Sequence, residues 1–247
     1  MEKYNEQMLS HPFFTEVFSD SGSVISRILD PQLNSSTRSE QEWYFSSVFF
    51  YLSNFCGSFV RLEHTRAFLG HLRLLKQYRE TGITRSTYIE YHRSNHAVTL
   101  VGIFDIALIL TSKVFRLGLP ERQCRSEIIT QNSWVRSREV DRILQELNSA
   151  VEPLREPRNL FIHRGILQVD EFLTALGAYD LLEGKGMVGK GGPLETIDRS
   201  KTEFAYEQKL SVILDELRRQ EEPVFNTSMS LLTRLHLVYK DWKQKIA

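Results

Sequence analysis

One short stretch of the sequence brings together side chains that can hold an anion and move a proton. It lies between Pro157 and Gly165 and contains Arg158, Asn159 and His163. A guanidinium donates paired hydrogen bonds to phosphate or carboxylate oxygens, and an imidazole titrates near neutral pH and can act as an acid or a base. An amide can orient either group. Within six positions, these residue types indicate a site for anion binding and proton transfer.

The residues around Arg158 recur at intervals of three and four positions. Arg158 shares this register with apolar side chains, namely Val140, Leu144, Leu147, Val151, Leu154 and Phe161. On a continuous helix they would form one packing seam. An arginine on such a seam must be paired, hydrated or held for an anion, because leaving it buried alone costs roughly several kcal/mol. On a helix Asn159 and His163 share a face, and Arg158 lies about 140° from His163, within reach of the same small ligand.

The six residues from Arg158 to His163, Arg-Asn-Leu-Phe-Ile-His, resemble the Arg-polar-x-x-x-His motif of the HEPN superfamily, the higher-eukaryote-and-prokaryote nucleotide-binding domains. The Ile-His-Arg-Gly ending at 162 to 165 and the segment from 102 to 107 also resemble one bacterial branch of this superfamily. The resemblance covers approximately residues 38 to 182. It implies an all-α bundle and a composite site across a two-fold homodimer.

The same resemblance implies an endoribonuclease that uses no metal ion and no cofactor. RNA carries its own nucleophile, the 2′-OH, which attacks the adjacent phosphorus when a base removes its proton. His163 would be this base or the matching acid, Arg158 would stabilise charge on the phosphate, and Asn159 would orient the histidine or the phosphate. Such an enzyme would be a toxin or defence-type RNase. The resemblance also implies a nucleotidyltransferase-type antitoxin as a partner.

The net charge of the chain does not favour RNA binding. Lys+Arg and Asp+Glu both number 31, so the chain has no bulk positive field to gather nucleic acid. RNA would have to be bound by a local cluster of arginines. We expect Arg155 and Arg164 to bind substrate beside Arg158.

The pattern of apolar residues predicts an all-α fold, a HEPN-like helical bundle of long antiparallel helices with additional C-terminal helices. No strand-like alternation is long enough to indicate a sheet. Helices are expected at 40–78, 86–115, from Ser133 or Ser137 through the motif, and at 170–182, 197–221 and 225–242. Two prolines, Pro153 and Pro157, lie near the motif. They leave two alternatives open there, one kinked helix or two helices, the second of which would put the motif at a phosphate-favouring helix N-terminus.

No convincing linker of Gly, Ser or Pro divides the 247 residues, so the sequence predicts a single domain. Its expected parts are an N-terminal arm and loop at 1–37, the HEPN-like core at 38–182, a glycine-rich loop at 183–193, and at 194–247 a C-terminal hairpin in which Pro223 separates two helices. Hydrophobic residues make up 41% and charged residues 25%, which is typical of a soluble globular protein.

Asp105 lies within the most apolar run, at 97–111, which is shorter than a membrane span. We expect a buried core helix, no membrane partner, and a buried carboxylate that needs a donor. Asp105 would then anchor a cation or amide of the motif helix, with structural pairing elsewhere as the alternative. Cys56 and Cys124 lie in helix-like sequence with no secretory signal ahead of them, and they favour a reducing cytoplasmic location.

Other interpretations remain open. His92 and His96 stand four apart, a spacing that can hold a metal ion, but no third ligand is evident, so a hydrogen-bonded or solvated pair is favoured and no metal is expected. Arg158 and His163 could instead be a core arginine pinned to a carboxylate and a satisfied histidine. The chain would then be a helical scaffold. A third possibility is a non-catalytic HEPN-like module that binds a nucleotide, RNA or a protein.

Overall fold

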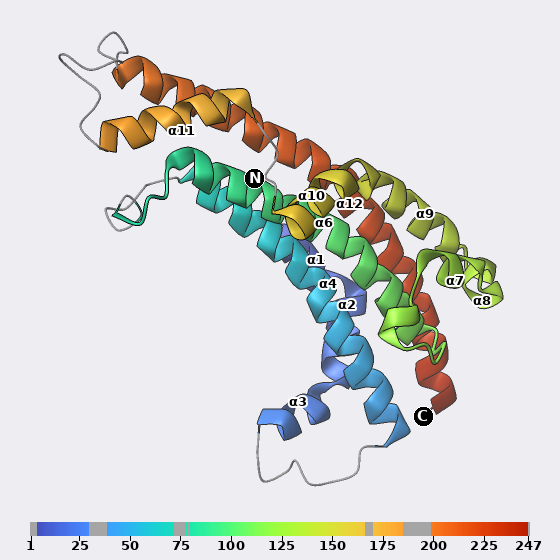
Figure 1. Cartoon of the computed structure of the whole chain (residues 1–247). Coiled ribbons are helices and arrows are strands. Elements are labelled where there is room, and N and C mark those ends of the chain that lie inside the picture. Colours follow the sequence, from blue (N-terminus) through green and yellow to red (C-terminus); the bar gives the residue numbers. More distant parts are fainter. Residues whose placement is uncertain are drawn as a thin grey trace. The chain divides into compact units, whose positions relative to one another are not determined.

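Every regular element in the described part of the chain is helical. The computed structural model describes residues 4–29, 39–71, 78, 80–165, 170–184 and 199–246. Figure 1 shows the helices in chain order, and they are α1 (Tyr4–Ser10), α2 (Pro12–Asp20), α3 (Gly22–Leu29), α4 (Glu40–Gly70), α6 (Arg85–Val114), η1 (Glu121–Gln123), α7 (Ser126–Gln131), α8 (Ser133–Ser137), α9 (Val140–Val151), η2 (Glu152–Leu154), α10 (Arg155–Arg164), α11 (Glu171–Gly184) and α12 (Arg199–Ile246). The prediction of an all-α fold is confirmed.

Where the sequence predicts a single domain, the chain divides into two compact units. Unit 1 comprises Met1–Glu63, Leu100–Pro153 and Glu222–Ala247, and unit 2 comprises His64–Thr99 and Leu154–Glu221. The long helices α4, α6 and α12 therefore each contribute residues to both units. Because a helix has no linker composition where it passes from one unit to the other, the sequence shows no sign of this division.

In unit 1 the core is built from the apolar spacing seen in the sequence. Fully or almost fully buried side chains include Val48, Leu52, Phe55, Phe59 and Leu62 of α4, Ile103, Ala107 and Leu110 of α6, and Leu231, Leu235 and Tyr239 of α12. Burying an aliphatic or aromatic side chain contributes about 1.5–3 kcal/mol. This repeated burial along long helices explains why the 3- and 4-residue pattern predicted the elements well.

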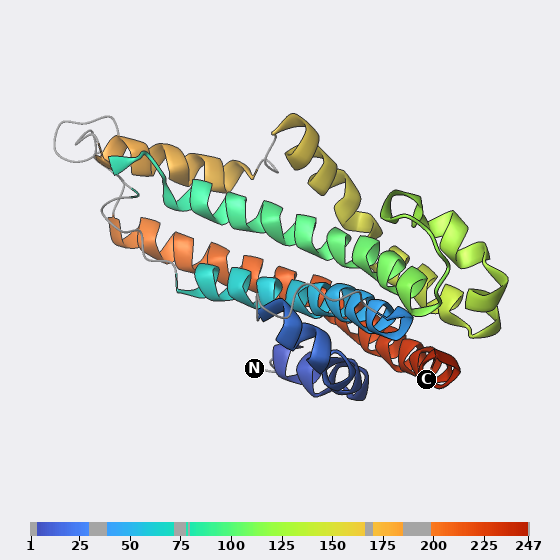
Figure 2. The same cartoon turned by 90° about the horizontal axis from the view of Figure 1, so that it is seen from below.

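The N-terminal segment is more regular than its composition indicates. The loop expected from Asp20 onward is wrong where it is described, because Gly22–Leu29 form α3, and the arm expected before it forms the helices α1 and α2. Phe13 and Val17 of α2 are fully buried, and Ser21 donates a hydrogen bond to the carbonyl of Phe45. Figure 2 shows α2 beside the C-terminal part of α12, where Tyr239 donates to Asp20 at 2.9 Å. Tertiary packing thus overrides the weak helix propensity of the Ser- and Gly-rich sequence.

In unit 2 the helices α4, α6, α11 and α12 share a second apolar core. Its buried members are Leu69, Ile89, Leu173, Leu176, Tyr206, Ile213 and Leu217. The expected helix at 170–182 corresponds to α11. Most of the glycine-rich loop expected at 183–193 lies outside the described residues, as do residues 72–77 of the first long helix.

The predicted C-terminal hairpin is wrong. Helix α12 is continuous over 48 residues and contains Pro223. A proline removes the hydrogen bond to the carbonyl four residues earlier, here that of Arg219. Both Pro223 and Arg219 are exposed, so water can take the place of the lost donor. Glu221, Val224 and Phe225 are buried on the other side of the helix and hold it in place.

A buried ionic cluster joins three helices within unit 2. Glu221 of α12 is completely buried and accepts hydrogen bonds from Arg66 of α4 and from Nε2 of His96 of α6, the latter at 3.0 Å. Arg66 is 6% exposed and His96 1% exposed, so none of the three groups can use bulk water as its partner. A carboxylate in such a place must be paired, and its two partners fix three helices against one another.

Helix α6 is also long and apolar enough to cross a membrane. An 18-residue window within Arg85–Val114 has a mean hydropathy of 1.9, but 61% of that window is buried within the protein. The core helix of a soluble protein has the same length and composition. The hydropathy of α6 therefore gives only weak support to a membrane span.

We predict that Glu221→Ala lowers the free energy of unfolding by about 3–5 kcal/mol, because Arg66 would be left with an uncompensated buried charge. Chemical denaturation followed by circular dichroism measures this change. Glu222→Ala is the matched control, since Glu222 is the next residue and is exposed. It should change the stability by less than about 0.5 kcal/mol. Equal effects of the two substitutions would contradict the assigned role of Glu221.

A second prediction concerns acid stability. Burial raises the pKa of Glu16, but hydrogen bonds and charge from His236 and Lys243, at 2.7 and 3.0 Å, outweigh it and hold the pKa below its ordinary value of 4.5. A carboxyl with a depressed pKa in the folded state stabilises the fold above about pH 4.5 and loses that contribution as pH falls through its folded value.

Glu16→Gln should therefore flatten the loss of stability between neutral pH and acid. Denaturant unfolding measured at a series of pH values tests this expectation. Glu127→Gln, at an exposed position of α7, is the control and should leave the slope unchanged. If Glu16→Gln leaves the slope of stability against pH unchanged, the ion pairs of Glu16 do not contribute to acid stability.

Candidate functional site

The residues of the motif lie on a short helix of their own. Helix α9 ends at Val151, a 3-10 turn covers Glu152–Leu154, and α10 runs from Arg155 to Arg164. Of the two alternatives left open by the sequence, the structure has two helices. Pro153 lies in the turn, and Pro157 is the third residue of α10, where a backbone N–H has no acceptor within the helix.

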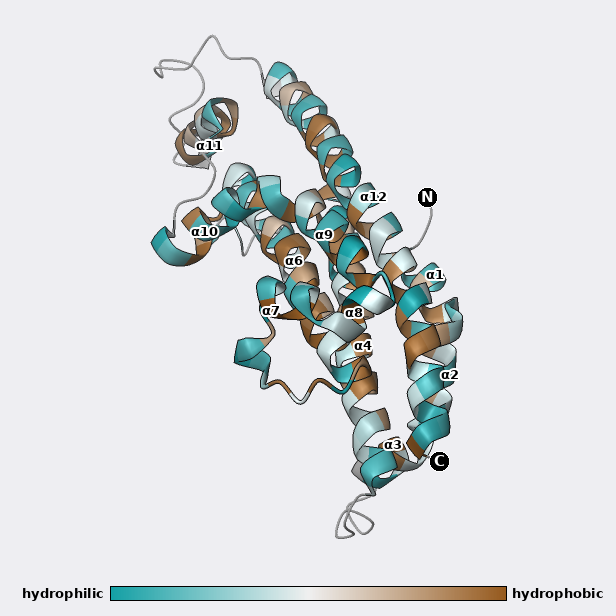
Figure 3. Ribbon diagram, turned by 90° about the vertical axis from the view of Figure 1, so that its right-hand side faces the viewer, coloured by the Kyte–Doolittle hydropathy of each residue, from teal (hydrophilic) through white to brown (hydrophobic). Residues whose placement is uncertain are grey.

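Burial changes along the predicted seam. Val140, Leu144, Leu147 and Val151 are fully buried and Leu154 is 7% exposed, whereas Arg158 and Phe161 are only half-buried. No residue of α10 is completely buried. Figure 3 shows α10 mostly in the hydrophilic colour. The apolar seam therefore ends at Leu154, and α10 presents polar side chains to solvent.

Arg158 has an incompletely satisfied guanidinium. Its Nη1 donates to Oδ1 of Asn159 at 3.0 Å. Its Nε is buried and has no hydrogen-bond partner in the described chain, and no carboxylate of that part of the chain forms an ion pair with it. This differs from a core arginine pinned to a carboxylate. Asn159 orients the arginine, and the remaining N–H groups of Arg158 can bind an anion.

His163 is exposed in the last turn of α10. Ile162 and Arg164 beside it are also exposed, and Ile162 is 45% exposed despite its apolar side chain. The helix ends at Gly165, whose φ is +63° and whose N–H bonds the carbonyls of Leu160 and Phe161. This left-handed cap ends α10 two residues after the histidine, so the imidazole lies in the last turn of the helix.

The other predicted site residues have different surroundings. Arg155 is half-buried at the first position of α10, and Arg164 is exposed at the last. The expectation of a buried Asp105 is wrong, because its side chain is exposed. Asp105 falls on the least buried stripe of α6, together with the half-buried Gly102 and Ile109 at helical spacing. It also belongs to unit 1, whereas the motif belongs to unit 2.

The two histidines of α6 have separate roles. His96 is the buried partner of Glu221, which agrees with the prediction of a hydrogen-bonded histidine. His92 packs against the ring of Tyr88, with ring centroids 4.4 Å apart, and burial lowers its pKa. Among the described residues, no group of three or more His, Cys, Asp or Glu side chains could hold a metal ion.

A second polar cluster of unit 2 was not found from the sequence. Asp180 of α11 accepts from the guanidinium of Arg85 at 2.9 Å, from the backbone N–H of Arg85 at 3.2 Å and from Tyr206 at 2.9 Å. Arg85 also pairs with Glu203 and lies 4.0 Å from the ring centroid of Tyr206. Burial and Asp180 together raise the pKa of Tyr206, although a hydrogen bond with Ser86 acts in the opposite direction.

The Arg85 cluster borders an open cavity of about 660 Å³, lined also by His71 and Ile89. Its arginine already has two carboxylate partners, so the cluster fixes the start of α6 and leaves no unpaired positive charge for an anionic ligand. The residues come from three helices, and Ser86 and Tyr206 alone are 120 positions apart. No local spacing could have revealed them.

No family model, no curated protein and no solved structure matches this chain.

The cap of α10 gives a third prediction. A Cβ at position 165 would meet no atom within 4 Å, so Gly165→Ala would be strained only by its positive φ. We expect a loss of about 1 kcal/mol, measured as weaker hydrogen-exchange protection of the α10 amides and lower overall stability. Gly102→Ala in the middle of α6 also meets no atom and should stabilise by about 0.5–1 kcal/mol. If both variants change the stability in the same direction, the role of Gly165 as the left-handed cap of α10 is contradicted.

Proposed function

We propose that the chain is a HEPN-like, metal-independent endoribonuclease whose active site is the surface of α10. The observation that carries this proposal is the half-buried guanidinium of Arg158, which has donors to spare and no carboxylate partner in the described chain. It lies on the same ten-residue helix as the exposed imidazole of His163. A charged donor and a proton-transfer group are the two parts that phosphate transfer by the 2′-OH of RNA requires.

In this mechanism one imidazole removes the proton of the 2′-OH, and the resulting oxygen attacks the adjacent phosphorus. The bond from phosphorus to the 5′-oxygen of the next nucleotide breaks, and a second imidazole protonates that oxygen. The products are a 2′,3′-cyclic phosphate and a 5′-hydroxyl. Arg158 donates to the non-bridging oxygens, where negative charge grows in the transition state. Asn159 holds the guanidinium through its 3.0 Å hydrogen bond.

Each chain has one histidine on α10, so a complete acid–base pair requires a second copy. A two-fold interface places the same surface of each subunit face to face. Ile162, which is 45% exposed beside His163, provides apolar surface for such an interface. Arg155 and Arg164, at the two ends of α10, would then contact flanking phosphates. We therefore propose a homodimer as the active form.

The single imidazole of α10 also favours a second candidate function, a non-catalytic module that binds RNA or a nucleotide. Such a protein needs Arg158 but not a pair of histidines. It would bind RNA without cleaving it, and the two candidates are separated by measuring turnover and binding with the same variants.

The fourth prediction tests the nuclease. The purified chain should cleave a single-stranded RNA in excess chelator and leave 2′,3′-cyclic phosphate ends. His163→Ala should lower the rate by at least about 100-fold, and Arg158→Ala by about 100-fold or more. His64→Ala and Arg122→Ala, at exposed positions elsewhere, are the matched controls and should cleave as the parent does.

Two outcomes contradict the nuclease. One is cleavage that requires an added metal ion, and the other is full activity of His163→Ala. If no RNA is cleaved but binding is lost in Arg158→Ala and kept in Arg122→Ala, the binding module replaces the enzyme.

A further inference from the structure

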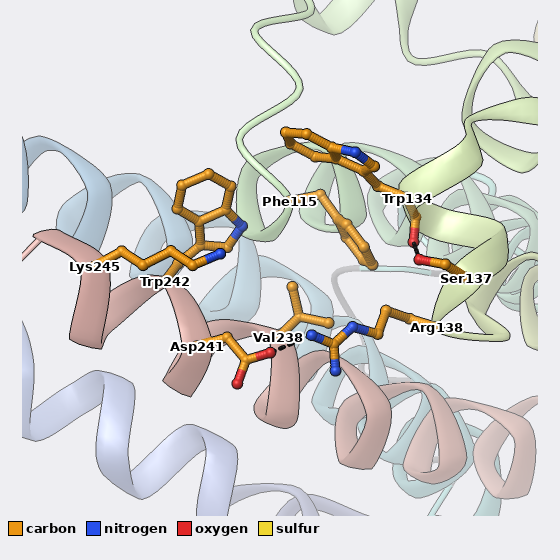
Figure 4. Close-up of a pocket in the computed structure, with 8 residues that line it drawn as sticks. All are labelled: Phe115, Trp134, Ser137, Arg138, Val238, Asp241, Trp242 and Lys245. Carbon is orange, nitrogen blue, oxygen red and sulfur yellow. Dashed lines mark hydrogen bonds and ion pairs between the residues drawn. The ribbon is translucent and has the colours of Figure 1, made fainter.

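Two tryptophans of unit 1 line one open cavity that no part of the proposed nuclease uses. Figure 4 shows Trp134 of α8 and Trp242 of α12 beside the same space, with Phe115 between them. The two rings are 6.1 Å apart between centroids and inclined by 47°. The cavity measures about 220 Å³ and is also lined by Ser137, Arg138, Val238, Asp241 and Lys245. We call it the tryptophan slot.

The walls of the slot expose aromatic surface. Trp134 is 56% exposed and Trp242 is half-buried, while Phe115 is buried and forms the floor. Tryptophan has the largest apolar surface of any side chain, and exposing it to water in a hollow is unfavourable unless something covers it. The cavity is smaller than the roughly 300–1,000 Å³ of pockets that enclose a whole drug-sized ligand. It suits a single flat ring system with the rest of the ligand outside.

The charges around the slot favour an anionic ligand. The Nζ of Lys245 lies 4.8 Å and the guanidinium of Arg116 lies 5.2 Å from the ring centroid of Trp242. Arg116 is paired with Glu40, and Arg138 with Asp241. Lys245 is exposed and, in the described part of the chain, contacts the ring of Trp242 but forms no ion pair. The slot therefore has a surplus positive charge beside its aromatic face, which would repel a cation such as a methylated ammonium group.

The backbone around the slot is strained at two positions. Arg116 and Glu139, with φ of +54° and +58°, are the non-glycine residues of the described chain that have positive φ. Arg116 follows Phe115, and Glu139 follows Arg138, so each adjoins a lining residue. A left-handed conformation costs about 1–2 kcal/mol for an ordinary residue. Such strain is common where a chain must direct a particular side chain into a site.

We propose that the tryptophan slot binds one unstacked base of a single-stranded nucleic acid. The base stacks on the exposed face of Trp134 or Trp242, and the adjacent phosphate is bound by Lys245, whose ammonium lies 4.8 Å from the ring centroid of Trp242. Stacking accepts any base, because every base has a π-face, while the phosphate contact accounts for the positive charge. This inference does not depend on cleavage by α10, since the residues belong to the other unit and a stacking site is useful to a binding module as well.

The protein offers a clean fluorescence experiment. It contains three tryptophans, so in Trp43→Phe the entire tryptophan emission comes from the slot. We expect an oligouridylate of about six nucleotides to quench this emission saturably. Trp134→Leu and Lys245→Gln are each made in the Trp43→Phe background, and binding is measured by the anisotropy of a labelled oligonucleotide. Both substitutions should weaken binding, and Trp134→Leu should weaken it by about tenfold or more.

Trp43→Leu is the matched control, because Trp43 is 60% exposed in the same unit and does not line the slot. It should bind the oligonucleotide as tightly as the parent. Three results would overturn the proposal: no quenching at millimolar oligonucleotide, equal weakening by Trp43→Leu and Trp134→Leu, or inorganic polyphosphate competing as well as the oligonucleotide at equal charge. The last result would mean that charge alone is recognised.

The experiment separates this proposal from the nuclease. His163→Ala is expected to abolish cleavage and to leave slot quenching unchanged, whereas Trp134→Leu is expected to reduce quenching and leave intact the ability to form cyclic phosphate at saturating RNA. Cleavage and slot quenching are therefore tested separately, and the failure of one proposal would leave the other unaffected.

Discussion

The pairing of one buried carboxylate determines much of how unit 2 is built. Glu221 has no exposed surface, and its partners Arg66 and His96 come from α4 and α6. A buried charge without its partner costs several kcal/mol, roughly, so the three helices must keep the register that brings these side chains together. The same constraint helps to keep α12 continuous through Pro223, since Glu221 and the buried Val224 anchor the helix on either side of it.

Arg158 differs from other buried or half-buried arginines of unit 2 in having no carboxylate partner in the described chain. Arg66 and Arg85 are buried or half-buried arginines, and each has carboxylate partners. Arg158 is half-buried too, yet its Nη1 donates to the amide oxygen of Asn159 and no carboxylate of the described chain forms an ion pair with it. Its guanidinium is therefore available for an external anion, unlike those of Arg66 and Arg85. That contrast, more than the motif itself, supports an anion site on α10.

The spacing of residues along the sequence predicted the long helices correctly, but it could not predict features that depend on contacts between distant parts of the chain. The spacing of Leu52, Phe55, Phe59 and Leu62 predicted a long helix, and the structure confirms it, because a buried helical face imposes that period. The same logic failed at Pro223, whose effect depends on which side of the helix meets water. It failed again at Asp105, because an apolar run does not show which of its positions lies on the exposed stripe. The tryptophan slot joins residues more than 100 positions apart, and no pattern along the chain could reveal it.

Taken by itself, the zero net charge of the chain argues against nucleic acid as a ligand, since 31 basic and 31 acidic residues produce no long-range attraction. That objection holds only for proteins that bind through phosphates alone. Stacking on an aromatic ring contributes about 1–3 kcal/mol per base. A few well-placed cations such as Lys245 can therefore be enough when an indole supplies the rest. Binding of this kind would depend less steeply on salt than binding to a basic surface, because fewer counterions are released for the same affinity.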